Sequence, residues 1–403
     1  MSEERPINLD AHATTPCDPR VVEAQHPYFT EEFGNPASRT HAYGWGAERA
    51  VERARGQIAR LIGARSREVL FTSGATEANN LALFGIARAN RDRGDHIIVC
   101  ATEHRSVLDP ARALEKEGFQ VTRVGVDRSG RIRLDELREA AREGTLIISV
   151  MHANNEIGVL QTLEDVASVA RSRGIPLHTD AAQSVGKVPV DVGRLGVDLL
   201  SLSGHKLYGP KGVGILYVRR QSPPLQIQPL LYGGGHERGL RSGTLAVPLC
   251  VGLGRACEIA QAELAEEAQR TRALRERLWG GLESELDAIR LNGHAEDRLP
   301  GNLNVSFVGV EASALLLALP DLALSSGSAC TSGSPEPSHV LLALGLPPAE
   351  ALSAIRIGIG RFTTRGEVDM AARRIVDEVR RLRAASPHWE DLRGRGRRAE
   401  AGP

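Results

Sequence analysis

A lysine among small, hydrogen-bonding residues follows an apolar strand-like run near the middle of the chain. The run covers residues 197–202, and the lysine is Lys206 in the sequence SGHK. A second strand-like run, residues 175–179, ends at the carboxylate of Asp180. A lysine amine can form a Schiff base, and a carboxylate can hold a pyridinium nitrogen protonated. The pair indicates pyridoxal phosphate, although a lysine after a strand is, taken alone, more often a solvated surface charge.

A turn of small residues is the candidate phosphate site. The sequence SGATE, residues 73–77, lies between a strand-like run and a helix-like segment that starts at residue 78. Backbone N–H groups at a helix N-terminus, together with the hydroxyl of Thr76, favour a bound phosphate. The alternative is an ordinary helix cap with its glutamate. Ser203 and His205, beside the candidate lysine, favour the phosphate interpretation.

Three more polar side chains follow strand-like runs. His104 could stack on a planar ring and transfer protons, because imidazole titrates near neutrality; the alternative is a structural histidine. Asn155 could donate to a phenolic oxygen or a carboxylate, or lie in an ordinary asparagine-rich turn. Gln183, three residues after Asp180, offers an amide in the same way as Asn155. Ligands in open α/β sheets bind beyond the carboxyl ends of the strands, so these positions indicate one common site.

Two residues near the C-terminus complete the candidate chemistry. Cys330 lies in an eleven-residue stretch, 325–335, of almost only Ser, Gly, Thr, Ala and Pro. Such a composition cannot bury a core, so we expect a flexible loop with an accessible thiol that acts as a nucleophile or in redox chemistry. Arg356 lies inside an apolar strand-like run and requires an anionic partner, either an internal carboxylate or the carboxylate of an amino-acid substrate.

The composition excludes several classes of protein. The 403 residues carry 50 basic and 50 acidic side chains, so no net charge favours DNA or an anionic membrane. No apolar run reaches the length of about 18 residues that a membrane span needs, and the N-terminus lacks the features of a targeting peptide. The five cysteines form no Cys-x-x-Cys pair, which argues against a disulfide framework and a zinc site. We expect a cytoplasmic protein without a metal ion.

The order of the elements predicts an α/β fold. From about residue 66 to 220, short β-rich runs alternate with helix-like segments, which is typical of a mostly parallel sheet with flanking helices. We expect a large α/β domain over residues 15–260 and a smaller α+β domain formed by residues 1–14 and 261–392, which carries the Cys330 loop. The last residues, 393–403, are expected to form a disordered tail.

The motifs occur together in the order found in a known family. The chain resembles the cysteine desulfurases of the bacterial housekeeping iron–sulfur type, in the class V aminotransferase family, from about residue 7 to 392. The matching blocks are ATTP (13–16), GNPAS (34–38), TSGATE (72–77), TEH (102–104), NNEIG (154–158), DAAQS (180–184), SGHK (203–206), GGGHERG (233–239), RSGT (241–244) and SSGSACT (325–331).

The resemblance implies a role for each candidate residue. It implies a type I pyridoxal-phosphate transferase fold with a seven-stranded-type sheet, in a homodimer with both active sites at the subunit interface. Lys206 would form the Schiff base, Asp180 would pair with the ring nitrogen, Gln183 would touch the ring oxygen and His104 would lie over the ring. The phosphate would be held by Ala75, Thr76, Ser203 and His205 and by Thr244 of the other subunit, while Asn155 and Arg356 would bind the substrate.

The resemblance also implies a reaction. L-Cysteine would be converted to L-alanine, and Cys330 would take the sulfur as a persulfide and pass it to an acceptor protein, for iron–sulfur cluster assembly or tRNA thiolation. Two features depart from the pattern: His12 stands where relatives carry other residues, and the Gly- and Arg-rich tail lacks their apolar C-terminal segment. Alternatives are a selenocysteine lyase or small amino-acid aminotransferase on the same fold, for which Cys330 would be unnecessary, and a catalytically silent sulfur carrier.

Overall fold

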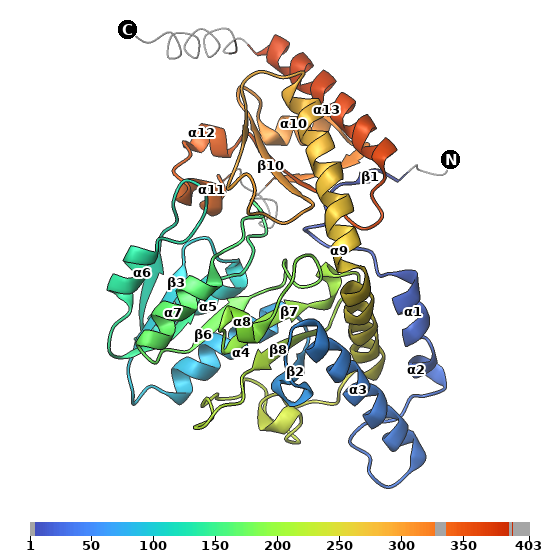
Figure 1. Cartoon of the computed structure of the whole chain (residues 1–403), viewed down its shortest axis with the longest axis vertical. Coiled ribbons are helices and arrows are strands. Elements are labelled where there is room, and N and C mark those ends of the chain that lie inside the picture. Colours follow the sequence, from blue (N-terminus) through green and yellow to red (C-terminus); the bar gives the residue numbers. More distant parts are fainter. Residues whose placement is uncertain (1–4, 327–335, 387–388, 390–403) are drawn as a thin grey trace.

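A seven-stranded sheet forms the centre of the larger part of the molecule (Figure 1). The computed structural model describes residues 5–326, 336–386 and 389. The order of the strands across the sheet is β2 (Val69–Thr72), β8 (Gly214–Val218), β7 (Leu199–Ser203), β6 (Leu177–Asp180), β5 (Thr145–Ser149), β3 (His96–Cys100) and β4 (Gln120–Val124). Strand β8 is antiparallel to both of its neighbours, and every other pairing in this sheet is parallel. The mostly parallel sheet predicted from the sequence is therefore confirmed.

Apolar side chains cover both faces of this sheet. Along β3, Ile98 packs into one hydrophobic cluster, whereas Ile97 and Val99 pack into another, because successive side chains of a strand point to opposite faces. The first cluster includes side chains of α3 (Ala42–Leu61), α6 (Leu134–Ala140), α7 (Leu163–Ser172) and α8 (Val192–Leu195). The second is formed with α4 (Ala75–Ala89) and α5 (Arg105–Lys116). Burial on both faces explains why the central strands are continuously apolar.

A smaller antiparallel sheet lies at the other end of the molecule, at the top of Figure 1. Its strand order is β12 (Ser325–Ser326), β13 (Ala354–Gly358), β10 (Asn302–Phe307) and β9 (Ile289–Leu291), and β1 (Ile7–Asn8) pairs in parallel with β11 (Leu322–Ala323). The other elements of this part are α10 (Ala312–Ala318), α11 (His339–Ala343), α12 (Pro348–Ala351) and α13 (Arg365–Ala385). The short helices α1 (Pro19–Gln25) and α2 (Pro27–Thr30) follow the N-terminal arm.

One long helix, α9 (Val247–Glu283), runs through both parts of the molecule (Figure 1). Its first half contributes side chains such as Leu253 and Cys257 to the core of the large sheet. Its second half contributes Leu274, Leu278 and Leu282 to the core of the small sheet, which also contains Leu9 of the N-terminal arm. We propose on this basis that the large domain covers residues 15–260 and the small domain residues 1–14 and 261–392, with the boundary inside α9. The tail predicted for residues 393–403 lies outside the described residues.

A buried ion pair fixes the GGGHERG segment against the large sheet. Glu237 accepts hydrogen bonds at 2.8 Å from both terminal nitrogens of Arg55, and its Oε2 also accepts from the backbone N–H of Phe71 at 2.7 Å. The Arg55 and Glu237 side chains are only 6% and 4% exposed. Phe71 belongs to β2, the strand that leads into the candidate phosphate turn.

We expect Glu237→Ala to lower the free energy of unfolding by about 3–5 kcal/mol, because it removes the buried carboxylate that pairs with both terminal nitrogens of Arg55. Urea denaturation of the two proteins measures the change. Glu52→Ala is the matched control. Glu52 also pairs with Arg55, at 2.9 Å, but the Glu52 side chain is 58% exposed. Removing this exposed pair should lower the free energy of unfolding by at most about 1 kcal/mol. Equal losses in the two variants would contradict the prediction.

Within the described ranges, no helix is long and apolar enough to cross a membrane. The four cysteines in those ranges, Cys17, Cys100, Cys250 and Cys257, are free thiols. Cys330 lies outside them.

Candidate active site

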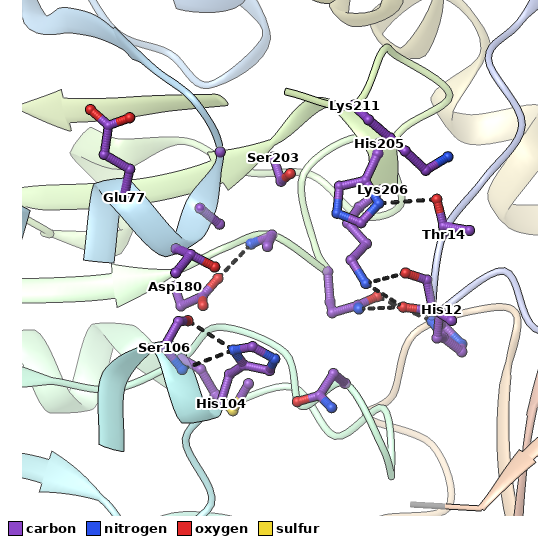
Figure 2. A pocket seen from close by; sticks show the side chains of 18 of the residues that line it. His12, Thr14, Glu77, His104, Ser106, Asp180, Ser203, His205, Lys206 and Lys211 are labelled. Atoms are coloured by element: carbon purple, nitrogen blue, oxygen red, sulfur yellow. Dashed lines mark hydrogen bonds between the residues drawn. The ribbon is translucent and has the colours of Figure 1, made fainter. Parts of the chain in front are cut away.

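A cavity of about 570 Å³ lies at the carboxyl end of the parallel strands (Figure 2), and residues 12–14 of the N-terminal arm and Arg356 of β13 also line it. Ten of the residues predicted from the sequence line it: Ala75, Thr76, His104, Asn155, Asp180, Gln183, Ser203, His205, Lys206 and Arg356. They come from the ends of β6 and β7, from segments that follow β2, β3, β5, β6 and β7, and from β13 itself. Parallel strands end at the same edge of a sheet, so residues as far apart in the sequence as Ala75 and Arg356 meet here.

Lys206 projects toward the N-terminal arm. It lies at the end of a 3-10 turn, Gly204–Lys206, that directly follows β7. Its Nζ donates to the carbonyl oxygens of His12 and Ala13, each at 2.7 Å (Figure 2). These two hydrogen bonds hold the amine in the cavity. They must break before the amine can form a covalent bond.

Asp180 is the last residue of β6 and is 5% exposed. Its Oδ2 accepts from the side-chain amide of Asn79 at 2.7 Å, and its Oδ1 accepts from the backbone N–H of Ala182 at 2.9 Å. Hydrogen bonds from two donors stabilise the charge of a buried carboxylate. Asp180 is therefore suited to face a protonated ring nitrogen.

The N-terminus of α4 has the features of a phosphate site. Its N-cap is Gly74, whose φ of 154° is strained for any other residue, and no side chain caps the helix. The N–H groups of the first turn are thus available to an anion, and Ser203, His205 and Lys211 line the same part of the cavity. Burial, together with the neighbouring lysine charges, lowers the pKa of His205 to about 4, so its imidazole is a neutral hydrogen-bonding group at neutral pH.

His104 caps helix α5 with its own ring. Its Nδ1 accepts from the backbone N–H of Ser106 at 3.1 Å and lies 2.8 Å from the Ser106 hydroxyl. Burial, the largest contribution, lowers the pKa of His104 below its usual value. The ring is therefore neutral at physiological pH and lines the cavity near Asp180 (Figure 2).

Gln183 is held by two residues that the motif analysis gave no role. Its Nε2 donates to the carbonyl of His12 at 2.9 Å, and its Oε1 accepts from Nζ of Lys187 at 3.0 Å and lies 3.2 Å from Nδ1 of His12. Burial, and in addition the charge of Lys206, lowers the pKa of Lys187 to about 7. No sequence signal identified Lys187, which is separated from the motif DAAQS by an ordinary turn.

Arg356 already has an internal carboxylate partner, one of the two possibilities that the sequence left open. Its Nη2 bonds Oδ1 of Asp10 at 2.8 Å, and its Nη1 donates to the carbonyl of Asn155 at 3.1 Å. The side chain is 5% exposed and still lines the cavity. A substrate carboxylate would have to share this guanidinium with Asp10.

Two predicted site residues are not among the described residues that line the cavity. Thr244 is exposed at the surface of this chain, three residues after Arg241, which pairs with the cavity residue Glu77 at 2.9 Å. Cys330 lies outside the described residues. The described chain before it ends in β12, where the hydroxyl of Ser325 donates to Oδ1 of Asp10, the same oxygen that Arg356 contacts.

Comparisons with known proteins agree with this geometry. Residues 7–370 match the model of the aminotransferase class-V family. The chain is 54% identical over 385 residues to the cysteine desulfurase IscS of Anaeromyxobacter sp. (strain Fw109-5). The matched region covers 96% of this chain and 95% of that protein. It is 53% identical over 386 residues to the human cysteine desulfurase, covering 96% and 84% of the two chains.

Solved structures give the same result. A NifS-like protein superposes with a TM-score of 0.86 at 38% identity, over 92% of this chain and 98% of its own. SspA in complex with cysteine superposes with a TM-score of 0.79 at 37% identity, over 89% and 100% of the two chains.

The chain therefore belongs to the class V aminotransferase family of pyridoxal-phosphate enzymes. Within that family it groups with the housekeeping cysteine desulfurases. The residues of the cavity fit the cofactor: an uncapped helix N-terminus for the phosphate, a buried carboxylate for the ring nitrogen and a lysine amine for the carbonyl carbon.

Proposed function

We propose that this protein is a pyridoxal-phosphate-dependent cysteine desulfurase that converts L-cysteine to L-alanine and takes the sulfur on Cys330. The observation that carries the proposal is the meeting of Lys206, Asp180 and the uncapped N-terminus of α4 in one cavity. When bound, the cofactor supplies an electron sink that labilises bonds at the substrate's Cα and Cβ.

The residues of the chain have distinct tasks in this proposal. Thr76, Ser203 and His205, with the first turn of α4, hold the phosphate, and Thr244 of the partner subunit adds to this site. With the cofactor bound, Asp180 would pair with its ring nitrogen, Lys206 would hold its carbonyl carbon, Gln183 would contact its ring oxygen, and Asn155 would help to bind the cofactor and the substrate. Arg356, in competition with Asp10, binds the substrate carboxylate. His104 would lie over the ring as a neutral imidazole, because burial lowers its pKa.

The transfer of sulfur from L-cysteine to Cys330 needs no added oxidant, because its atoms and electrons balance. The thiolate of Cys330 attacks the substrate's sulfur, the Cβ–S bond breaks, and the carbon fragment takes up the protons that make it alanine. The sulfur remains as a persulfide, Cys–S–SH. Cys330 is five residues beyond Ser325, and five extended residues span at most about 18 Å. Ser325 and the cavity residue Arg356 both bond Oδ1 of Asp10, so Ser325 lies close to the cavity. A segment of this length is therefore long enough for the Cys330 thiol to reach the substrate, which supports the proposed transfer.

The persulfide is then available to a sulfur acceptor, which we propose to be a protein of iron–sulfur cluster assembly or tRNA thiolation. The names of the relatives support the first of these. We further propose a homodimer. Aromatic side chains on the surface of this chain support it: Phe29 and Phe33 are each 61% exposed, Tyr43 stacks on Phe33 at 5.0 Å, and Trp45 is 47% exposed. The free thiols of the described cysteines favour a reducing compartment and thus the cytoplasm.

The test is to add L-cysteine and a thiol reductant to the purified holoenzyme and quantify alanine and sulfide. Equal amounts of the two products are expected, because the reductant cleaves the persulfide and releases one sulfide per turnover. Pyruvate with sulfide, or neither alanine nor sulfide, would overturn the proposal. L-Selenocysteine and L-aspartate, run in parallel, distinguish a selenocysteine lyase and an aminotransferase.

A further inference from the structure

A buried asparagine lies between Asp180 and His104. Asn79, on the first turns of α4, is fully buried. Its side-chain nitrogen donates to Oδ2 of Asp180 at 2.7 Å and to the hydroxyl oxygen of Ser106 at 2.8 Å. That hydroxyl lies 2.8 Å from Nδ1 of His104. A continuous hydrogen-bonded chain therefore connects the carboxylate at the end of β6 to the imidazole before α5.

The direction of each hydrogen bond in this chain is determined by its neighbours. The amide nitrogen of Asn79 must face Asp180, because an amide oxygen at that distance would repel the carboxylate. Both hydrogens of the amide are then used, one on Asp180 and one on the oxygen of Ser106. The Ser106 hydroxyl accepts one of them, and because Nδ1 of His104 already accepts from the Ser106 backbone N–H and so carries no hydrogen, the hydroxyl hydrogen is donated to Nδ1.

Nδ1 of His104 consequently faces two donors. The hydroxyl and the backbone N–H of Ser106 both point at it, at 2.8 and 3.1 Å. A hydrogen on Nδ1 would collide with both, so the proton of the neutral ring must be on Nε2. Protonation of Nδ1 would require the hydroxyl to rotate away and would lose the bond from the backbone.

We propose that Asn79 and Ser106 are positioning residues for the reaction: they fix the orientation of the Asp180 carboxylate and hold His104 as a neutral imidazole with its hydrogen on Nε2. In this state His104 offers the cavity an N–H donor and cannot accept a proton at Nε2. The inference deepens the proposed function and rests on it for its catalytic meaning, whereas the tautomer itself follows from the hydrogen bonds.

Charged and titratable groups from several elements surround His104. Asp180 at the end of β6 and Asp109 on α5 favour the imidazolium, and Lys206 after β7 and Arg105 on α5 oppose it. His339 on α11 is also close, and its Nε2 lies 3.1 Å from the carbonyl of Glu103. Burial acts in the same direction as the lysine and is the largest contribution to the lowered pKa of His104. None of these groups is replaced in the variants below. A difference in the His104 pKa or tautomer between the variants therefore reports on Ser106 and Asn79.

The test is NMR of the holoenzyme with isotope-labelled histidine rings, with the His104 signals assigned by their loss in His104→Gln. In the wild type we expect the Nε2–H tautomer and a pKa below that of a free imidazole. Ser106→Ala should raise the pKa of His104 by about one unit, a tenfold change in proton affinity, because one donor to Nδ1 is lost. Ser106→Thr, which keeps the hydroxyl, should restore the wild-type value.

Asn79→Ala should change the visible absorption of the bound cofactor and shift the His104 signals, since it removes a hydrogen-bond donor from both Asp180 and Ser106. Asn80→Ala is the matched control on the same helix, because the Asn80 side chain bonds only the carbonyl of Thr76 among the contacts described. Either an Nδ1–H tautomer in the wild type or an unchanged His104 pKa in Ser106→Ala would overturn the inference.

Activity separates this inference from the proposed function. An enzyme that forms alanine and sulfide but carries Nδ1–H on His104 refutes the inference alone. An Nε2–H tautomer that responds to Ser106→Ala, in a protein that forms neither product, supports the positioning of His104 and refutes the desulfurase.

Discussion

Cys330→Ala is expected to reduce sulfide and alanine formation from L-cysteine on the order of 10³-fold or more, with cofactor absorbance unchanged. The reason is that the described cysteines cannot replace this thiol. Burial raises the pKa of the thiols of Cys100 and Cys250 to about 12 and that of Cys257 further, so almost no thiolate exists at neutral pH. Single-turnover mixing, followed by mass spectrometry of the intact chain, should detect one added sulfur in the wild type and none in the variant.

Cys17→Ser is the control for this prediction. Cys17 is the least buried of the described cysteines, and burial raises its pKa as well, followed by the charge of Asp18. We expect this variant to release sulfide at the wild-type rate. Sulfide release by Cys330→Ala at the wild-type rate would refute the nucleophile.

Lys206→Ala is expected to abolish the visible absorbance of the lysine-bound cofactor and to lower the rate on the order of 10³-fold or more. The chain makes a direct assignment possible, because it contains only four lysines, Lys116, Lys187, Lys206 and Lys211. Borohydride reduces a Schiff base to a stable secondary amine. After reduction and proteolysis of the wild type, the phosphopyridoxyl group should be on the peptide that carries Lys206.

The other lysines make this result informative. Lys211 lines the same cavity, and Lys187 is buried with a pKa of about 7, so both have some of the properties of a reactive amine. A label on either of them would show that the Schiff-base residue was misassigned. Lys116→Ala, at the exposed end of α5, should retain both the absorbance and the activity.

The sequence was informative about the central sheet, because its strands share one simple pattern. The central strands are buried on both faces and are continuously apolar, so β2, β3, β5, β6, β7 and β8 could be predicted from their composition. Because parallel strands end at one edge, the residues after them could be grouped into one site. Strand β4 was not predicted, since it lies at the edge of the sheet and carries the polar residues Gln120, Thr122 and Arg123.

The connections between site residues could not be predicted. Asp10 is 346 residues from Arg356 in the sequence and meets it only because the N-terminal arm crosses to β13. Asn79 lies inside a helix whose pattern shows only that this face is buried. Lys187 and the carbonyl oxygens of residues 12 and 13 hold site residues from loops, where periodicity carries no information. Such contacts depend on tertiary packing rather than on local pattern.

The continuous helix α9 limits how this enzyme can open and close. A helix of 37 residues is about 55 Å long, and its two halves are packed into different cores. Near its middle, Arg270 also bonds the carbonyl oxygens of Gly360 and Thr363, which follow β13. A hinge between the two proposed domains would have to break this helix or pull one half of it from its core. We therefore expect substrate entry and product release to depend on local segments at the rim of the cavity, and the two parts of the molecule to tumble as one rigid body.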